Sequence, residues 1–157
     1  MAFKSVNEIS AFSFEDCMIT KFEYKEKEVY MELEALIVKA NNSQNTNYTE
    51  SYAGPTQVRL QGAKVISGYQ EGSKYYDAND VLVEQVPDQP VAPLEYDSVI
   101  KKCVDAQAYL FQLEPQQVEN GFSYRMFLDL EETTYMITVS FSKSIAEWER
   151  FQNKFMQ

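Results

Sequence analysis

The stretch "FSYRMFLDLEETTYMITVSF", from Phe122 to Phe141, decides the fold. Every second residue is apolar from Phe122 to Leu130, and again from Tyr135 to Phe141. In a strand, successive side chains point to opposite faces, so this period places one apolar face on a core. Glu131 starts the polar turn between the two runs. The stretch therefore predicts an antiparallel hairpin.

A similar pattern near the N-terminus predicts a second hairpin. Residues 19–24 form its first strand, and the charged residues 25–28 form its turn. From Val29 the odd positions are apolar, whereas Glu32 and Glu34 lie on the other face. Both faces become apolar towards Val38, so this strand is expected to run from an edge into the interior of the fold.

Between the two hairpins, the apolar phase changes at a glycine. Val58 and Leu60 are even-numbered, but Ala63 and Val65 are odd-numbered, so the phase slips by one residue at Gly62. Such a slip is typical of a β-bulge or a sharp strand bend. It predicts a strongly curved sheet, as in a barrel or a sandwich whose strands cross between layers.

Other segments are expected to connect strands. Residues 41–55 are polar, turn-rich and without periodicity, which predicts a long mobile loop. A short strand is expected at 81–86, followed by an extended, proline-rich connector at 87–93 that could act as a hinge. With 157 residues, the chain fits one β-rich domain, 1–157.

Two segments show helical spacing. Residues 95–106 carry apolar side chains at helical intervals with Asp97 as a cap, although their β-branched content leaves a strand open as the alternative. A strand is expected at 108–113. Near the C-terminus, Ser144 can cap a helix with one apolar face. That face comprises Ile145, Trp148, Phe151 and Phe155.

Together these elements predict a mainly β fold. We expect an antiparallel sandwich or partly open barrel with one or two short helices, including the C-terminal amphipathic helix. That helix would pack as a lid across an open end or face of the sheet, with Trp148 in the core.

Charge narrows the classes of partner. The chain has 24 acidic and 14 basic residues, a formal charge of −10. Phosphate backbones and anionic lipids would repel it, so neither nucleic acid nor a membrane surface is an expected partner. The acidity fits a solvated surface or recognition of a basic protein. With no signal-peptide core and no apolar run long enough to cross a membrane, a cytoplasmic protein is expected.

The chain contains no histidine, which removes the commonest general base and metal ligand. No glycine-rich phosphate loop occurs, and we expect neither a metal nor another cofactor. Cys17 and Cys103 are expected to be small buried residues, and the acidic neighbours of Cys17 make it a poor thiolate. The segment 77–80 lacks the glycine and distal glutamate of a calcium loop and is expected to be a turn.

Candidate binding residues come from two groups. The first group is the tyrosines in or beside the expected loops, where a core position is harder to assign. These are Tyr48, Tyr52, Tyr69, Tyr75 and Tyr76. The second group is Glu32 and Glu34, which share the polar, solvent-facing side of a strand and could contact a basic partner.

The two ends of the chain carry a resemblance. The chain resembles small β-rich bacterial proteins of uncharacterised families in two places. The first is Phe14-Glu15-Asp16-Cys17 with Ile19 and the hairpin that follows, and the second is the final Glu147-Trp148. Some of those proteins are regarded as immunity or accessory proteins. Glu15 stands where that pattern often has a histidine. The resemblance implies a fold and no established activity.

Three functions are compatible with these features. The leading hypothesis is a non-enzymatic cytoplasmic protein that works by protein–protein interaction, as an immunity or accessory module does. The first alternative is a small-molecule or carbohydrate-binding β-barrel or sandwich that uses the tyrosines. The second is a hydrolase that uses two facing carboxyl groups, for which Glu32 and Glu34 or Glu131 and Glu132 are the available pairs.

Overall fold

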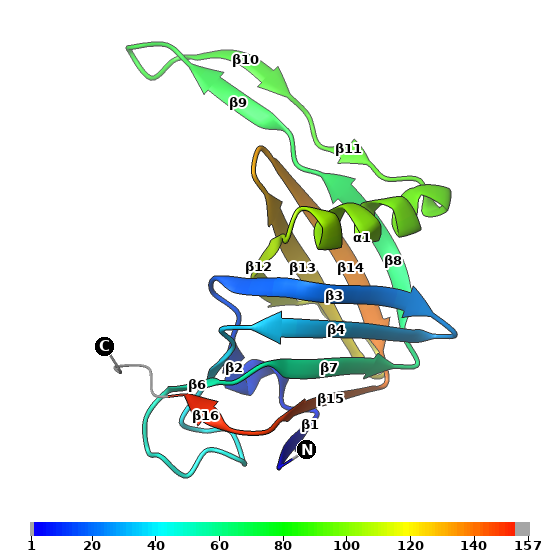
Figure 1. The fold of residues 1–157 in the computed structure, drawn as a ribbon. Helices are drawn as coiled ribbons and strands as arrows, with labels where there is room; N and C mark the ends of the chain where they lie inside the picture. The colour runs from blue at the N-terminus through cyan, green and yellow to red at the C-terminus, as the bar shows by residue number, and fades with distance from the viewer. Residues whose placement is uncertain (1, 153–157) are drawn as a thin grey trace.

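A computed structural model describes residues 2–152 and contains a large antiparallel sheet of ten strands (Figure 1). In spatial order the strands are β1 (Phe3–Val6), β15 (Lys143–Trp148), β7 (Thr56–Gln61), β4 (Glu28–Glu34), β3 (Cys17–Lys25), β12 (Tyr109–Pro115), β13 (Phe122–Leu130), β14 (Thr133–Phe141), β8 (Lys64–Gln70) and β11 (Gln89–Pro90). The series is open, with β1 at one end and β11 at the other. The predicted mainly β, antiparallel fold is confirmed, and the sheet does not close into a barrel.

The sheet folds over itself where β3 meets β12. These two strands share only two paired positions, Tyr109 with Met18 and Leu110 with Cys17. On one side of this junction lie β4, β7 and β15, and on the other lie β13, β14 and β8, which cross the first group at a steep angle (Figure 1). The fold therefore has two layers made from one sheet.

The apolar faces of the two layers form the core. Met31 and Val58 come from the first layer, and Met126 and Val139 come from the second; all four line the same small cavity. That cavity is about 10 Å³, so the side chains fill the space between the layers. Trp148 is fully buried, as predicted.

Both predicted hairpins form. β13 and β14 pair along their whole length from Phe122 with Phe141 to Leu130 with Thr133. β3 and β4 are joined by Glu26 and Lys27, both in the left-handed conformation that tight hairpin turns require. The expected continuation of this strand to Val38 is wrong, because Ala35 also has a positive φ of 66° and turns the chain out of the sheet.

The phase slip at Gly62 marks a bend between strands. Gly62 has φ 65° and follows β7, whereas β8 begins at Lys64 and pairs with β14 in the other layer. A Cβ at Gly62 would lie 2.5 Å from Ser142 Oγ, so the close approach also requires glycine. The predicted bend thus carries the chain from one layer to the other.

A smaller sheet of four short strands takes one strand from the segment predicted as a loop. It contains β2 (Phe12–Ser13), β5 (Ile37–Val38), β6 (Ser51–Ala53) and β16 (Phe151–Gln152). The prediction of an irregular loop over 41–55 is therefore wrong at β6. Asn45 orders the part of this segment that precedes β6. Its Nδ2 donates hydrogen bonds to the carbonyl oxygens of Val38, Lys39 and Thr49.

The helical alternative for 95–106 is confirmed. A short 3-10 turn, η2 (Pro93–Glu95), leads into α1 (Tyr96–Asp105), which contacts β3. Val99, Ile100 and Cys103 form its buried stripe. Asp97 does not cap the helix, since the N-cap residue is Glu95 and its side chain makes no capping hydrogen bond. A second 3-10 turn, η1 (Ile9–Ala11), precedes β2.

The C-terminal helix predicted from Ser144 is wrong. Residues 143–148 form β15, which pairs with β1 on one side and with β7 on the other. The Ser144 amide donates to Asn7 Oδ1 instead of starting a helix. Strand pairing on both sides outweighs the helical spacing of Ile145 and Trp148. Phe155, the last residue of the predicted helix, lies outside the described residues.

The remaining strands form a separate ribbon. β9 (Ser73–Tyr76) and β10 (Leu82–Val86) pair only with each other and project from the end of the sheet beyond β8 and β11 (Figure 1). The strand predicted at 81–86 is therefore present. In the part of the chain described here, no helix is long and apolar enough to cross a membrane.

Candidate interaction surface

The β9–β10 ribbon, residues 73–86, is named the arm below. Every residue of β9 and β10 is exposed. The exposed apolar side chains are Tyr75, Tyr76, Val81, Leu82, Val83 and Val86, with exposed fractions between 42% and 63%. Monomeric proteins rarely leave apolar side chains grouped in this way unless the surface meets a partner. The arm is the strongest candidate for a binding surface.

Hydrogen bonds hold the arm at its root. The Gly72 amide donates to Asp88 Oδ1 at 2.8 Å, and the Glu71 amide donates to the Thr134 carbonyl oxygen at 2.8 Å. A Cβ at Gly72 would lie 1.9 Å from the Val86 carbonyl oxygen, so only glycine lets the two chain segments approach so closely. These contacts position the arm relative to the sheet.

The tip of the arm is a turn organised by one carboxylate. Asp77 Oδ1 accepts hydrogen bonds from the amides of Asn79 and Val81 at 2.8 and 3.0 Å. The Asp77 amide donates to the Val81 carbonyl oxygen, and Asp80 adopts a positive φ of 60°. The segment 77–80 is thus the turn that the sequence predicted.

The register distributes apolar residues over both faces of the arm. Tyr75 lies opposite Glu84 and Ser73 lies opposite Val86, which places Tyr75 and Val86 on one face. Tyr76 lies opposite Leu82, and adjacent strand residues point to opposite faces, so this pair occupies the second face. Neither face is covered by the rest of the described chain.

The predicted tyrosines do not form one surface. Tyr75 and Tyr76 lie in the arm, and Tyr69 lies in β8 near its root, where it pairs with Pro90 of β11. Tyr48, 95% exposed, and Tyr52 of β6 belong to the smaller sheet and its loop, at the other end of the molecule (Figure 1). The structure brings three of the five into one region.

Glu32 and Glu34 lie on the outer face of β4. Glu32 accepts a hydrogen bond from the Tyr30 hydroxyl at 2.9 Å, whereas Glu34 is exposed. Both line an open hollow of about 490 Å³, which Glu149 and Arg150 also line. The two carboxylates therefore face solvent beside a cationic side chain.

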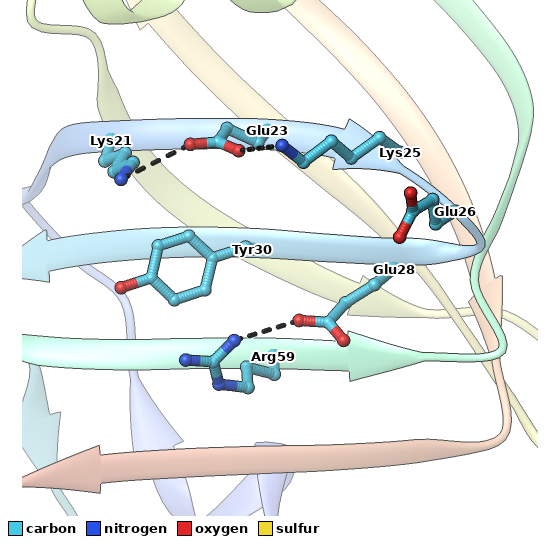
Figure 2. A pocket seen from close by; sticks show the side chains of 7 residues that line it. All are labelled: Lys21, Glu23, Lys25, Glu26, Glu28, Tyr30 and Arg59. Carbon is cyan, nitrogen blue, oxygen red and sulfur yellow. Dashed lines mark hydrogen bonds and ion pairs between the residues drawn. The ribbon is translucent and has the colours of Figure 1, made fainter.

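A second hollow follows the same outer face and holds alternating charges (Figure 2). Glu23 bridges Lys21 and Lys25 at 3.4 and 3.5 Å. Arg59 contacts Glu28 at 3.1 Å and lies over the Tyr30 ring, 4.6 Å from its centroid. The Lys21–Glu23–Lys25 contacts run along β3, whereas Arg59 and Glu28 pair across β7 and β4, a cross-strand contact of the kind that stabilises a sheet face.

Tyr30 at the centre of this hollow is held in its neutral form. Partial burial raises its pKa to about 12, and the hydrogen bond to Glu32 and the negative charge of Glu32 act in the same direction. Tyr30 is therefore a hydrogen-bond donor at neutral pH and is poorly suited to be a general base.

The two cysteines are buried, as predicted. Burial raises the pKa of both thiols to about 12, and the charge of Asp16 adds to this effect at Cys17. Cys17 Sγ also contacts the Ala35 carbonyl oxygen at 3.6 Å. Neither thiol forms a thiolate at neutral pH, so neither is an activated nucleophile.

Across residues 2–152, no cluster of three or more cysteine, aspartate or glutamate side chains could hold a metal ion. The apolar interior is filled, and the larger hollows are open at the surface. The two charged hollows described above are thus surface features.

Sequence reasoning missed Val81 and the apolar residues of β10 as binding residues. Val81, Leu82, Val83 and Val86 read as an ordinary strand, and a strand of this composition is normally buried. The available signal was their position between an aspartate turn and three prolines, which isolates the strand from the rest of the sheet.

Comparisons with protein-family models, with curated proteins and with solved structures find no match to this chain.

Proposed function

We propose that this protein is a protein–protein interaction module, of an immunity or accessory type, which binds a basic partner and performs no catalysis of its own. The observation that carries the proposal is the arm, an anchored ribbon whose apolar side chains are exposed on both faces. Burying such side chains against a partner would stabilise a complex by about 25 cal/mol per Å² of apolar area removed from water.

The charge of the chain supports one class of protein partner. A formal charge of −10 attracts proteins of opposite sign and repels other acidic proteins. Opposite fields accelerate encounter and help to exclude wrong partners. The charge thus supports a basic protein as the partner.

The small-molecule alternative has weaker support. A ligand site normally encloses several hundred Å³ with converging polar groups, whereas the apolar cavity between the layers is about 10 Å³. The tyrosines that would provide a sugar platform are divided between two regions.

The hydrolase alternative requires two carboxyl groups that face each other across a cleft. Glu32 and Glu34 instead project side by side from one face of β4, and Glu32 accepts a hydrogen bond from the Tyr30 hydroxyl. Glu131 and Glu132 lie in the turn between β13 and β14.

The test is co-purification of the full chain from its native host at low and high salt. We expect a basic protein to co-purify, and we expect its yield to fall as ionic strength rises, because salt screens the attraction between exposed charges. If no basic protein is retained at low salt, or if retention does not depend on salt, the proposed function is wrong.

A further inference from the structure

The arm carries its acidic residues in a defined arrangement. Between residues 71 and 88 there are five acidic side chains and one basic side chain, Lys74, which gives a formal charge of −4. Glu71 and Asp88 lie at the root, and Asp77 and Asp80 lie at the tip. The apolar side chains occupy the length between these two ends, together with Glu84 on the face of Tyr75 and Lys74 on the face of Tyr76.

Apolar side chains are exposed to solvent on both faces of this section of the arm. Tyr75 and Val86 lie on one face, and Tyr76 and Leu82 lie on the other. A two-stranded ribbon alone is at best marginally stable in water. A partner that lies flat against the arm would cover only one of these pairs, whereas a groove with two walls would cover both.

A second copy of this chain fits the arm poorly. Two such arms, each with its root residues Glu71 and Asp88, would each bring a charge of −4 to the contact. Lys21, Lys25 and Arg59 lie together on the large sheet, but they are already paired with Glu23 and Glu28. We therefore expect the cationic side chains that contact the arm to come from a different protein.

We propose that the arm inserts into a groove on a basic protein, with apolar walls along the groove and Lys or Arg side chains at its two ends. The inference rests on the proposed function and specifies its surface and geometry. The walls cover the two apolar faces, and the terminal cations meet Asp77 and Asp80 at the tip and Glu71 and Asp88 at the root.

Photo-cross-linking from both faces tests this geometry. A benzoylphenylalanine at Tyr75 reports on one face, and the same residue at Tyr76 reports on the other. The matched control replaces Tyr48, which is 95% exposed and lies outside the arm. Each variant of the full chain is irradiated in the native host, and the adducts are identified by mass spectrometry.

We expect the same basic protein to be cross-linked from Tyr75 and Tyr76 and not from Tyr48. In extracts, adduct yield should fall severalfold between about 0.1 M and about 1 M salt, where the Debye length falls from ~10 to ~3 Å. An adduct from one face only, an adduct with a second copy of this chain, or a cross-link only from Tyr48 would overturn the inference.

The failure of this inference is distinguishable from the failure of the proposed function. A basic protein that co-purifies with the chain but forms no arm adduct would refute the arm as the docking element and leave the interaction function standing. If no basic protein co-purifies and no adduct forms, both are wrong.

Discussion

The amide of Gly72 donates a hydrogen bond of 2.8 Å to Asp88 Oδ1, and this contact ties the two ends of the arm together. Gly72 lies immediately before β9, and Asp88 lies two residues after β10. The arm thus leaves the sheet through a closed root, which gives its exposed side chains a fixed orientation.

Substitution of Gly72 by alanine is expected to open this root. The added Cβ would lie 1.9 Å from the Val86 carbonyl oxygen and 2.6 Å from Pro87 C, so the backbone must move. We expect faster amide hydrogen exchange in residues 73–86 and unchanged exchange in β13 and β14. As a control, Gly68→Ala meets only side-chain atoms, the nearest at 3.3 Å. Unchanged protection of the arm in Gly72→Ala would contradict this account of the root.

Trp148 is expected to be the most costly side chain to truncate. It is fully buried and packs against Phe3, Phe12 and Phe151. Trp148→Ala should lower the free energy of unfolding by about 3–5 kcal/mol, measured by urea denaturation. Leu94→Ala is the control, because that side chain is 98% exposed and should change stability by less than about 0.5 kcal/mol.

The indole nitrogen of Trp148 adds a second expectation. Within residues 2–152, Trp148 Nε1 is buried without a hydrogen-bond partner. Trp148→Phe removes this unpaired donor and keeps an aromatic ring, so it should cost much less than Trp148→Ala. Equal losses of stability in the two variants would contradict this expectation.

Asn45 is expected to hold the connection between β5 and β6. Its Nδ2 donates to three carbonyl oxygens, and alanine would leave these acceptors without that donor. The cost should be about 1–3 kcal/mol, with faster hydrogen exchange in residues 41–50. Asn41→Ala changes an exposed asparagine of the same segment and serves as the control. If both variants exchange at the same rate, the bonds of Asn45 do not order the segment.

Glu8 is expected to make stability depend on pH. Its partial burial alone would raise the pKa, but hydrogen bonds from the Ser43 hydroxyl, the Ser43 amide and the Ser5 hydroxyl outweigh that effect and lower it below 4.5. A carboxyl with a lowered pKa stabilises the fold above its unfolded pKa, and this contribution is lost as the pH falls through the folded pKa.

The difference in Tm between the natural chain and Glu8→Gln should therefore be larger at neutral pH than in acid. Thermal melts across the acid range, followed by circular dichroism, measure this difference. A constant difference at every pH would show that ionisation of Glu8 has no part in stability.

The fold was predictable where period-two alternation is complete. The hairpin from Phe122 to Phe141 and the bend at Gly62 followed from local pattern. The strand at 143–148 did not follow from local pattern. Its inward positions 144 and 146 hold the small residues Ser144 and Ala146, so the alternation of apolar side chains is weak. Ile145 and Trp148 are also three positions apart, which is a helical spacing. The identity of this strand depends on pairing with β1 and β7, which are distant in sequence.

The candidate surface was predictable only in part. Tyr75 and Tyr76 could be selected because they precede a polar turn. Leu82 and Val86 could not, since an apolar strand is expected to be buried, and only the tertiary structure shows that none of residues 2–152 covers this one. The sequence also placed Tyr48 and Tyr52 in the same candidate group as the arm tyrosines. It could not show that Tyr52 belongs to the smaller sheet, which is separate from the arm.

The central claim is that the arm, and not the face bearing Glu32 and Glu34, binds the basic partner. The most direct measurement is titration calorimetry. The partner that cross-linking identifies is purified free of this chain and titrated against three double variants of the full chain. Tyr75→Thr with Val86→Thr removes one apolar face, and Tyr76→Thr with Leu82→Thr removes the other. Threonine preserves β-propensity, so the ribbon should persist.

We expect each arm variant to weaken binding about tenfold or more, as loss of buried anchor residues does. The third variant, Glu32→Gln with Glu34→Gln, should bind within about threefold of the natural chain, because exposed charges contribute little individually. The reverse result, with normal affinity in both arm variants and a large loss in the Glu32 and Glu34 variant, would contradict the account.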